Sequence, residues 1–562
     1  MKRPRIGVYI CHCGTNIASY VDVKRLVELI RDVPDVVVAR DYRYMCSEPG
    51  QELIRGDLRD GKIDRVVVGA CSPNLHERTF RRVLEREGLN PFYLCHVSIR
   101  ENCSWVHDDK ESATKKAYEL VMGGIWRVRR LEPLTSTEIP IEKRVLIIGG
   151  GVSGITAAID ILDAGFDVVL VEKEDHLGGW VRRIWKGFPN LDPLDEFIES
   201  RIKKLLSYRN VKIYTSSTVS SLEGFFGSFK VKIKSKSGDV FEETVGSIIV
   251  AAGFKPFDAS RKPEFGYGRY DNVLTTVDLE ALFSSGKIRD LKPKSVAFIQ
   301  CVGSRDKVVG NDYCSRVCCM TVLKQAYLLK ELVPDVKIYV FYMDVRSFCK
   351  GCEEFYENVQ RKGVLYIRGN PSEIYKKGNS LFVRFEDTLL GGARELEVDL
   401  VVLAVGMEPP QDSHELSSIL GLQRDRNGFF LEAHPKLGPL DTYSEGIFIA
   451  GCCQGPKDIP DSISQAHGAA ARATLFFHKG KAVKEPIVAR VDEDICSGCR
   501  LCEGVCSFGA LEFDPKRKVM TVKEAACKGC GACSATCPSS AISLNHYKSP
   551  QVITWVEGIL VS

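Results

Sequence analysis

The sequence predicts a multidomain α/β protein with an N-terminal parallel α/β domain, a Rossmann-type α/β core and a small C-terminal α+β domain. Three observations support this prediction. Apolar runs alternate with amphipathic segments over residues 1–130, a glycine-rich loop follows a buried apolar run near Gly149, and eight cysteines crowd residues 496–537. With 562 residues, of which 44% are hydrophobic, the chain is long enough for several separate cores.

The composition restricts the class of protein. A formal net charge of +4 is small for 562 residues, which argues against a nucleic acid as the main partner. The sequence shows no leader and no apolar run of transmembrane length, so we expect a cytoplasmic protein. A chain of this length needs no disulfide staples, so its 22 cysteines predict a reducing compartment and thiolates reserved for metal.

The C-terminal cysteines form two runs with the spacing C-x-x-C-x-x-C-x-x-x-C. This is the ligand spacing of a ferredoxin with two 4Fe–4S clusters, in which the fourth cysteine of each run reaches the other cluster. We therefore predict a two-cluster ferredoxin domain over residues 486–547, followed by a tail over residues 548–562. The ligand sets are Cys496, Cys499, Cys502 and Cys537 for one cluster, and Cys527, Cys530, Cys533 and Cys506 for the other. A zinc ribbon is the alternative, but two interleaved sets of four thiolates favour clusters.

A flavin site is predicted after a linker over residues 131–142. The apolar run Val145–Ile148 leads directly into a G-x-G-x-x-G loop, a helix-like segment follows, and the next strand ends in an acid. The glycines let the backbone approach a pyrophosphate at a helix N-terminus, and the acid binds a ribose hydroxyl. With two later glycine positions, the predicted cofactor-binding residues are Gly149, Gly151, Gly154, Glu172, Gly253 and Gly451. These segments resemble the FAD domain of thioredoxin-reductase-like flavoproteins, over residues 143–280 and 400–480; a Rossmann-type fold with an empty site is the alternative.

Residues 281–399 resemble the second Rossmann-type unit of those flavoproteins, which is inserted into the first and binds NAD(P)H there. A second glycine loop should follow the strand Ser295–Gln300, but only Gly303 remains there. A pyrophosphate could not approach such a loop closely, so we expect that the chain does not take hydride from NAD(P)H. Four cysteines near the end of this strand predict a further 4Fe–4S cluster, with a pair of buried thiols as the alternative. They are Cys301, Cys314, Cys318 and Cys319.

The N-terminal domain, residues 1–130, carries six more cysteines. Four of them follow apolar runs that we expect to be parallel strands, whose carboxyl ends share one edge of a sheet. These runs are Ile6–Ile10, Val36–Ala39, Val66–Val68 and Phe92–Leu94. We predict another 4Fe–4S cluster at that edge, with isolated buried cysteines as the alternative. The choice of ligands stays open within the pool Cys11, Cys13, Cys46, Cys71 and Cys103, while Cys95 lies deep in an apolar run that suits core packing.

Several longer motifs now point to one family. They are Cys11–Gly14, Tyr44–Ser47, Cys71–Pro73, Asn102–Trp105, Gln300–Asp306, Tyr313–Cys319 and Gly451–Asp458. Over nearly its whole length the chain resembles the A-type subunit of heterodisulfide reductase, the FAD and iron–sulfur subunit of methanogens and many other anaerobes. The resemblance implies a cluster in the N-terminal domain and a second one held by the cysteines around Cys301. It also implies a catalytic role for Lys324 near the flavin N5, where a cation stabilises reduced flavin.

The resemblance further implies an oxidoreductase that accepts electron pairs at FAD and passes single electrons through about four 4Fe–4S clusters. The expected partners are heterodisulfide reductase B- and C-like subunits, together with an electron-donating subunit such as a hydrogenase or formate dehydrogenase. The expected assembly is a hetero-oligomer, and the pairing of two such complexes is left open. The disulfide-cleaving site would then lie on a partner chain. The electron donor and the terminal acceptor are also left open.

The chain departs from that family in two places. Full-length members carry another two-cluster ferredoxin inserted in the FAD domain, whereas His176–Lys230 contains no cysteine, which makes electron bifurcation doubtful. Cys349 and Cys352 form a C-x-x-C that the family usually lacks, and we expect this pair to be inert or structural. One alternative function is an NAD(P)H-dependent disulfide reductase that uses Cys349 and Cys352. Another is a non-catalytic, cluster-bearing scaffold.

Overall fold

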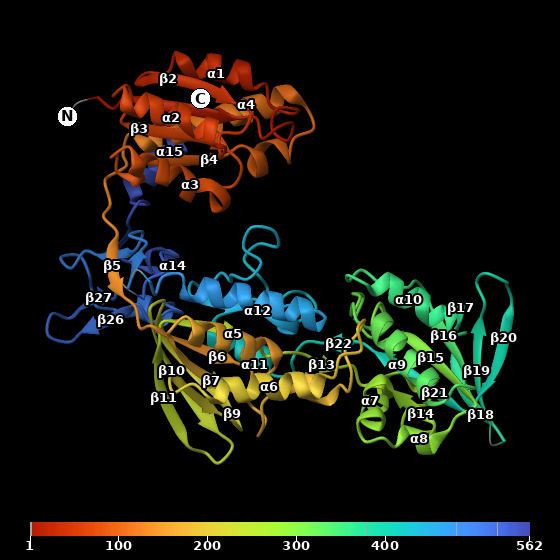
Figure 1. Cartoon of the computed structure of the whole chain (residues 1–562). Coiled ribbons are helices and arrows are strands. Elements are labelled where there is room, and N and C mark those ends of the chain that lie inside the picture. Colours follow the sequence, from red (N-terminus) through yellow and green to blue (C-terminus); the bar gives the residue numbers. More distant parts are fainter. Residues whose placement is uncertain (1–2, 379, 479, 525, 562) are drawn as a thin grey trace. The chain divides into compact units, whose positions relative to one another are not determined.

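The computed structural model describes residues 3–378, 380–478, 480–524 and 526–561, and the chain divides into two compact units (Figure 1). One unit combines Met1–Ile139 with Val483–Ser562, and the other is Pro140–Ala482. The predicted N-terminal domain begins at residue 1 and the predicted tail ends at residue 562, and both of these residues lie outside the described ranges. None of the described helices is long and apolar enough to cross a membrane.

The first unit begins with a parallel four-stranded sheet in the order β2-β1-β3-β4. Its strands are β1 (Ile6–Cys11), β2 (Val36–Tyr42), β3 (Arg65–Ala70) and β4 (Leu94–Ser98). Two separate apolar cores pack on its faces, one against α1 (Val23–Arg31) and α4 (Lys110–Val128), the other against α2 (Glu48–Arg59) and α3 (Pro73–Arg86). Because all strands are parallel, their carboxyl ends meet at one edge of the sheet.

The fourth strand differs from the sequence prediction. Pro91–Tyr93 forms a 3-10 turn, in which the Asn90 side chain accepts the backbone N–H of Phe92. Pro91 has no N–H to give to a sheet and favours the start of such a turn, so β4 begins only at Leu94. Cys95 therefore lies inside the strand, and the prediction that it follows the strand was wrong.

The C-terminal part of the first unit contains two short antiparallel strand pairs and two short helices. They are β25 (Ala489–Val491) with β28 (Ile542–Leu544), β26 (Leu511–Asp514) with β27 (Val519–Val522), α13 (Leu501–Gly504) and α14 (Ala532–Thr536). The tail forms α15 (Ser549–Leu560), which packs against α4. Glycines make this close contact possible, since a Cβ at Gly123 would lie only 2.7 Å from the Trp555 side chain, and one at Gly558 only 2.8 Å from Trp126.

The second unit contains two nested parallel sheets (Figure 1). The first has the order β23-β12-β6-β7-β8 and carries the glycine loop. Its strands are β6 (Arg144–Ile148), β7 (Asp167–Val171), β8 (Val211–Tyr214), β12 (Ser247–Val250) and β23 (Ile447–Ile449). It packs with α5 (Val152–Asp163), α6 (Leu194–Leu206) and α12 (Ile459–Thr474), and with the antiparallel strands β9 (Ser217–Phe225), β10 (Ser228–Ser235) and β11 (Val240–Val245).

The second sheet is inserted between β12 and β23 and has the order β14-β21-β15-β16-β17. Its strands are β14 (Val273–Thr275), β15 (Ser295–Val302), β16 (Lys337–Tyr342), β17 (Leu365–Arg368) and β21 (Leu400–Val405). One core packs it against α7 (Thr276–Ser284), α9 (Cys318–Leu332) and α10 (Cys352–Arg361), and another against β18 (Glu373–Lys377), β19 (Ser380–Glu386) and β20 (Ala393–Val398). This unit therefore has the predicted architecture of one Rossmann-type unit nested in another.

Candidate flavin and cluster sites

The glycine loop joins β6 to α5, and the three glycines of its motif, Gly149, Gly151 and Gly154, have different surroundings. A Cβ at Gly149 would collide with the backbone oxygen of Ala251, and one at Gly154 would collide with that of Gly149. At Gly151, by contrast, a Cβ would meet nothing within 4 Å. Gly151 is the N-cap of α5, so open space lies at the positive end of a helix, where a pyrophosphate binds.

Glu172 directly follows β7 and is held at the base of this loop. Its two carboxylate oxygens accept the backbone N–H groups of Gly150 at 2.6 Å and Glu174 at 2.9 Å. The side chain is buried. An acid fixed at the end of the second strand occupies the place from which dinucleotide-binding folds bind a ribose hydroxyl.

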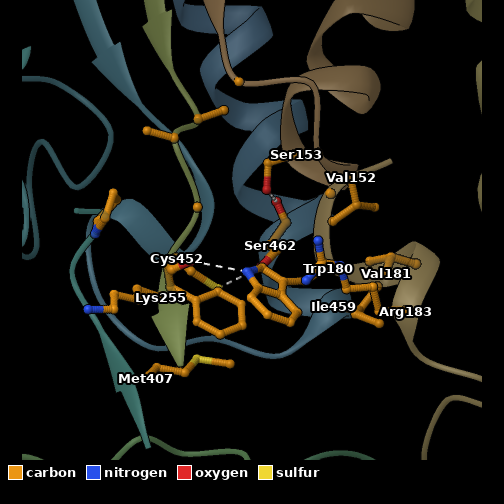
Figure 2. A pocket seen from close by; sticks show the side chains of 18 of the residues that line it. Val152, Ser153, Trp180, Val181, Arg183, Lys255, Met407, Cys452, Ile459 and Ser462 are labelled. Atoms are coloured by element: carbon orange, nitrogen blue, oxygen red, sulfur yellow. Dashed lines mark hydrogen bonds between the residues drawn. The ribbon is translucent and has the colours of Figure 1, made fainter. Parts of the chain in front are cut away.

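A cavity of about 820 Å³ opens in front of the loop (Figure 2). Four of the six predicted cofactor residues line it, namely Gly149, Gly151, Glu172 and Gly253. Gly154 and Gly451 do not line the cavity, and a Cβ at Gly451 would collide with the Ser153 side chain. The volume is in the range of cofactor pockets, and the donors and glycines present fit a flavin dinucleotide.

Other residues of the cavity wall have no signature in the sequence. Trp180 lies on a 3-10 turn, stacks on Phe254 with ring centroids 5.6 Å apart, and donates its indole N–H to the backbone oxygen of Phe254. Figure 2 shows Trp180, Met407 and Cys452, from three separate segments, around the cavity. Only tertiary structure brings these side chains together, although Cys452 lies in one of the long motifs.

Lys324 also lines the cavity, from α9. Sequence alone favours a solvated position on the helix surface, but the side chain is only 2% exposed. Its ammonium pairs with the Glu280 carboxylate at 2.5 Å. Burial lowers the pKa of Lys324, while Glu280 opposes that change. Glu280 is held in turn by the Gln325 amide at 2.7 Å and the backbone N–H of Trp185 at 3.1 Å.

The four cysteines of the second Rossmann unit gather where β15 ends and α9 begins. Cys301 lies near the end of β15, and Cys318 and Cys319 form the first turn of α9. Burial raises the pKa of Cys318 well above its usual value, and the charges of Cys301, Cys319 and Cys314 raise it further. These electrostatic contributions indicate that the four cysteines form one group.

Arg305 supplies a positive charge beside this group. Burial and Cys319 raise the pKa of Cys301 to about 12, and the positive charge of Arg305 opposes that rise. The Arg305 guanidinium pairs with the Asp344 carboxylate at 2.6 Å. The backbone N–H of Arg316 lies 3.3 Å from the Cys314 sulfur. Buried sulfurs near a cation, an N–H donor and a helix N-terminus suit an anionic 4Fe–4S cluster.

The C-terminal cysteines interact in the crossed pattern that the spacing predicts. Burial raises the pKa of Cys502, with further contributions from Cys499 and Cys537. Burial also raises the pKa of Cys533, with further contributions from Cys527, Cys530 and Cys506. Each fourth cysteine thus lies near the other run.

Backbone N–H groups surround these sulfurs. Ala510 donates to Cys506 at 3.3 Å, Gly529 to Cys527 at 3.4 Å and Met520 to Cys496 at 3.5 Å. Such N–H···S contacts stabilise anionic clusters. The residues present therefore fit two clusters.

At the N-terminal sheet edge, four of the pooled cysteines come together. Burial raises the pKa of Cys71 to about 12, and Cys13, Cys11 and Cys46 contribute to that rise. Backbone N–H groups of Cys13 and Met45 lie 3.3 and 3.4 Å from the Cys11 sulfur. The Arg100 guanidinium lies 3.7 Å from the Cys13 sulfur. This edge also offers thiols, N–H donors and a cation to a cluster.

Two N-terminal cysteines lie elsewhere. Cys103 is fully buried against α4, with its sulfur 2.9 Å from the backbone oxygen of Ala113. Cys95 is also buried, and the Arg127 guanidinium lies 3.6 Å from its sulfur. Both side chains belong to the core on the α1–α4 face of the sheet. The structure therefore brings together four of the five pooled residues and leaves Cys103 apart from them.

Within the described residues, no three His, Cys, Asp or Glu side chains converge on a single metal ion. A cubane carries its four iron atoms at separate corners, so its thiolates surround a volume instead of one point. A cluster needs no common point of convergence, so this finding concerns sites for single metal ions alone.

Comparison with known proteins identifies the family. The family described as "Pyridine nucleotide-disulphide oxidoreductase" matches residues 143–473, and the "4Fe-4S dicluster domain" matches residues 495–541. These matches confirm the predicted fold class. The thioredoxin reductase of T. acidophilum is a similar solved structure, with 17% identity, a TM-score of 0.43, and coverage of 60% of this chain and 100% of that chain.

Similar full-length relatives come from methanogens. An A-type iron–sulfur subunit of the CoB–CoM heterodisulfide reductase of Methanopyrus kandleri is 43% identical over 99% of this chain and 99% of its own length. The A-type subunit of the H(2):CoB-CoM heterodisulfide,ferredoxin reductase of Methanothermobacter marburgensis is 40% identical over 100% and 98%. Both alignments extend over 647 positions, against 562 residues here, so the relatives carry residues without a counterpart in this chain.

The identity and coverage of these matches confirm the predicted family. The flavin-type core and the 4Fe–4S ferredoxin domain are the two parts that the family matches recognise. The chain belongs to the family of heterodisulfide reductase A-type subunits, and it is a flavin- and iron–sulfur-dependent oxidoreductase.

Proposed function

We propose that the chain is the electron-transfer subunit of a heterodisulfide-reductase-like complex. When bound, FAD exchanges electron pairs and single electrons, and 4Fe–4S clusters carry single electrons. The observation that best supports this function is on α9. Its first turn carries Cys318 and Cys319, while Thr321 and Lys324 on the same helix line the flavin cavity. A cluster at these cysteines would be the first acceptor for electrons that leave the flavin.

The residues of the cavity have separable tasks in this proposal. The glycine loop and Glu172 hold the dinucleotide part of the cofactor. Lys324 holds a positive charge at the cavity wall, and the buried Glu280 keeps that ammonium in one position. A cation beside the flavin N5 favours the anionic reduced form, so Lys324 would raise the flavin reduction potential.

We assign four clusters to the chain, each to the cysteines that lie together. The two C-terminal ligand sets are the crossed ones given above, and a third set is Cys301, Cys314, Cys318 and Cys319. For the N-terminal cluster we propose Cys11, Cys13, Cys46 and Cys71. Cys103 is left out because its sulfur faces α4.

The second Rossmann unit does not favour a nicotinamide cofactor. Its remaining loop glycine, Gly303, has a φ of +70°, and a Cβ there would collide with the Phe257 ring. The loop therefore lacks the glycines that let a backbone approach a pyrophosphate closely, and its remaining glycine packs against an aromatic ring. This observation disfavours the NAD(P)H-dependent disulfide reductase as a second candidate function.

The names of the relatives support a proposal about partners. The Methanothermobacter protein is named for H₂ and ferredoxin, and a Methanosarcina acetivorans relative, 39% identical over 91% of this chain and 76% of its own length, for ferredoxin and F420H₂. For this chain we propose B- and C-like subunits that carry the disulfide-cleaving site, and a separate electron-donating subunit. The cysteine-free segment His176–Lys230 provides no ligands for a second ferredoxin module, so we propose turnover without obligatory ferredoxin reduction.

The experiment is turnover of the native complex, purified under anaerobic conditions with its partner chains identified. The donor and acceptor are supplied with and without ferredoxin. We expect the same coupled turnover in both cases. If turnover stops without ferredoxin, and ferredoxin is reduced in step when present, the proposed single path is wrong. Isolation of the chain without iron–sulfur partner subunits would contradict its role as a component of such a complex.

A further inference from the structure

Cys349 and Cys352 are joined by a disulfide, while the other twenty cysteines are free. Cys352 is the first residue of α10, and its backbone N–H donates to the backbone oxygen of Cys349 at 3.1 Å. Gly351 makes this turn with a φ of 79°. Cys352 is fully buried, whereas Cys349 is partly exposed. An accessible first cysteine and a buried second one at a helix N-terminus are typical of thiol pairs that exchange electrons.

A structural role explains this disulfide poorly. The two cysteines are only three residues apart, and the stabilisation by a cross-link grows with the length of the loop that it closes. Cys352 belongs to the apolar core beneath α10, against which Cys349 also packs. The side chains are therefore held by packing, and the covalent bond adds little to the fold.

The segment that leads into the disulfide, Asp344–Phe348, lies against the cysteine group at Cys301. The sulfur of Cys319 lies 3.8 Å from the backbone oxygen of Asp344, from which the chain runs directly to the disulfide. Next to the disulfide, the Phe348 ring lies under the guanidinium of Arg316, 4.7 Å from ring centroid to guanidinium carbon. Arg316 lies within the cysteine group itself, between Cys314 and Cys318.

The other side of the disulfide adjoins the wall of the flavin cavity. A Cβ at Gly351 would lie 3.5 Å from the ring of Pro189. Pro189 follows Phe188, which lines the cavity and packs against the same core as Cys349. Residues that flank the disulfide thus lie against segments of both sites between which electrons are proposed to move.

We propose that Cys349–Cys352 is a redox-active disulfide that stores an electron pair beside the proposed cluster at Cys301. In the forward reaction the S–S bond takes up two electrons, one at a time, from that reduced cluster, and two protons from solvent, to give two thiols. In the reverse reaction the thiols release two protons and two electrons, and the S–S bond forms again. The electrons come from the donor of the complex through FAD, so this inference rests on the cofactors of the proposed function.

The first test follows the bond itself. Trypsin cleaves after Arg346, Lys350 and Arg361, so Ser347–Lys350 and Gly351–Arg361 become two peptides joined only by the disulfide. The full chain, loaded with FAD and clusters, is reduced anaerobically in steps with titanium(III) citrate, trapped with iodoacetamide, and analysed by mass spectrometry. We expect the linked peptides before reduction and two alkylated peptides once the clusters are reduced.

A matched variant separates reduction through the cluster from direct chemical attack. In Cys301→Ser, which removes a ligand of the neighbouring cluster, the disulfide should be reduced at least tenfold more slowly under the same conditions. Equal rates in the two proteins would overturn the inference. It would also fail if the wild-type disulfide survives full reduction of the clusters, or if both cysteines are alkylated before any reductant is added.

The second test counts electrons. A coulometric titration of the wild-type chain should take up two more electrons per chain than the Cys349→Ala/Cys352→Ala variant with equal iron and flavin contents. An equal count would overturn the inference. The iron and flavin contents separate the two possible failures, because a fully loaded chain with an inert disulfide contradicts this inference alone. A chain without the cluster at Cys301 contradicts the proposed function as well.

Discussion

The two Rossmann-type units of this chain use the same strand–loop–helix element for opposite purposes. Between β6 and α5, Gly151 leaves open space at the helix N-terminus. Between β15 and α9, the corresponding loop packs Gly303 closely against the Phe257 ring, and Cys318 and Cys319 are the first residues of the helix. The helix end favours negative charge in both units. What lies in front of the helix, open space or sulfur, decides whether the site suits a dinucleotide or a cluster.

The largest expected effect concerns nicotinamide cofactors. We expect NADH and NADPH not to bleach the flavin of the isolated, loaded chain at a useful rate, because the second loop keeps only Gly303, which packs against Phe257. The flavin should bleach fully with dithionite, which serves as the control. Rapid anaerobic bleaching by NADPH would show that the second Rossmann-type unit also binds a dinucleotide. It would favour the function as a disulfide reductase that uses Cys349 and Cys352.

The next effect concerns the cluster at α9. Cys318→Ser should remove about four Fe per chain, one cubane, and lower the electron flow from the flavin to partner subunits by about 100-fold or more. Cys103→Ser is the matched control, because Cys103 is also buried but lies apart from the other cysteines. Iron analysis and rapid-mixing absorbance would measure the two quantities. An unchanged iron content in Cys318→Ser would contradict the assignment.

A pair of glycine substitutions sharpens the comparison between the loops. Gly151→Leu places a side chain in open space, so we expect loss of FAD with little change in the free energy of unfolding. Gly303→Ala forces a Cβ into Phe257, and we expect a loss of about 1–3 kcal/mol of stability with FAD still bound. Flavin content and urea unfolding measure both effects. The reverse pattern would show that the two loops have been assigned the wrong roles.

The smallest expected effect is on the flavin potential. Lys324→Met removes the cation at the cavity wall and should make the two-electron potential more negative by about 30–60 mV. Lys330→Met, on the same helix but away from the cavity, is the control and should leave the potential unchanged. A spectroelectrochemical titration gives both values. Equal potentials in Lys324→Met and wild type would show that the ammonium does not act on the flavin.

Local patterns were sufficient to predict much of this architecture. The fold class follows from strand–loop–helix order and cysteine spacing, while the nested units and the family follow from the resemblance of longer motifs to known proteins. All of these are properties of short stretches of consecutive residues. The crossed interactions of Cys502 with Cys537 and of Cys533 with Cys506 also agree with the spacing. Ligand spacing is informative here because a cluster requires nearby residues at fixed intervals.

Features that depend on tertiary packing were harder to predict. The burial of Lys324 depends on Glu280, which lies on another helix, and the position of Trp180 depends on Phe254. The start of β4 was misplaced because a turn at Asn90 and Pro91 interrupts an apolar run. Cys103 lies in the π-helical turn Arg100–Ser104 with its sulfur against α4, a position that no spacing reveals.

The central claim is that the second Rossmann-type unit holds a 4Fe–4S cluster at Cys301, Cys314, Cys318 and Cys319, and that the N-terminal sheet edge holds another. The most direct measurement is the iron and flavin content of the full chain, prepared anaerobically from cells that assemble its clusters. The account predicts about sixteen Fe and one FAD per chain, since four cubanes each contain four Fe. A value near eight Fe with one FAD would leave only the two C-terminal clusters and would contradict the account.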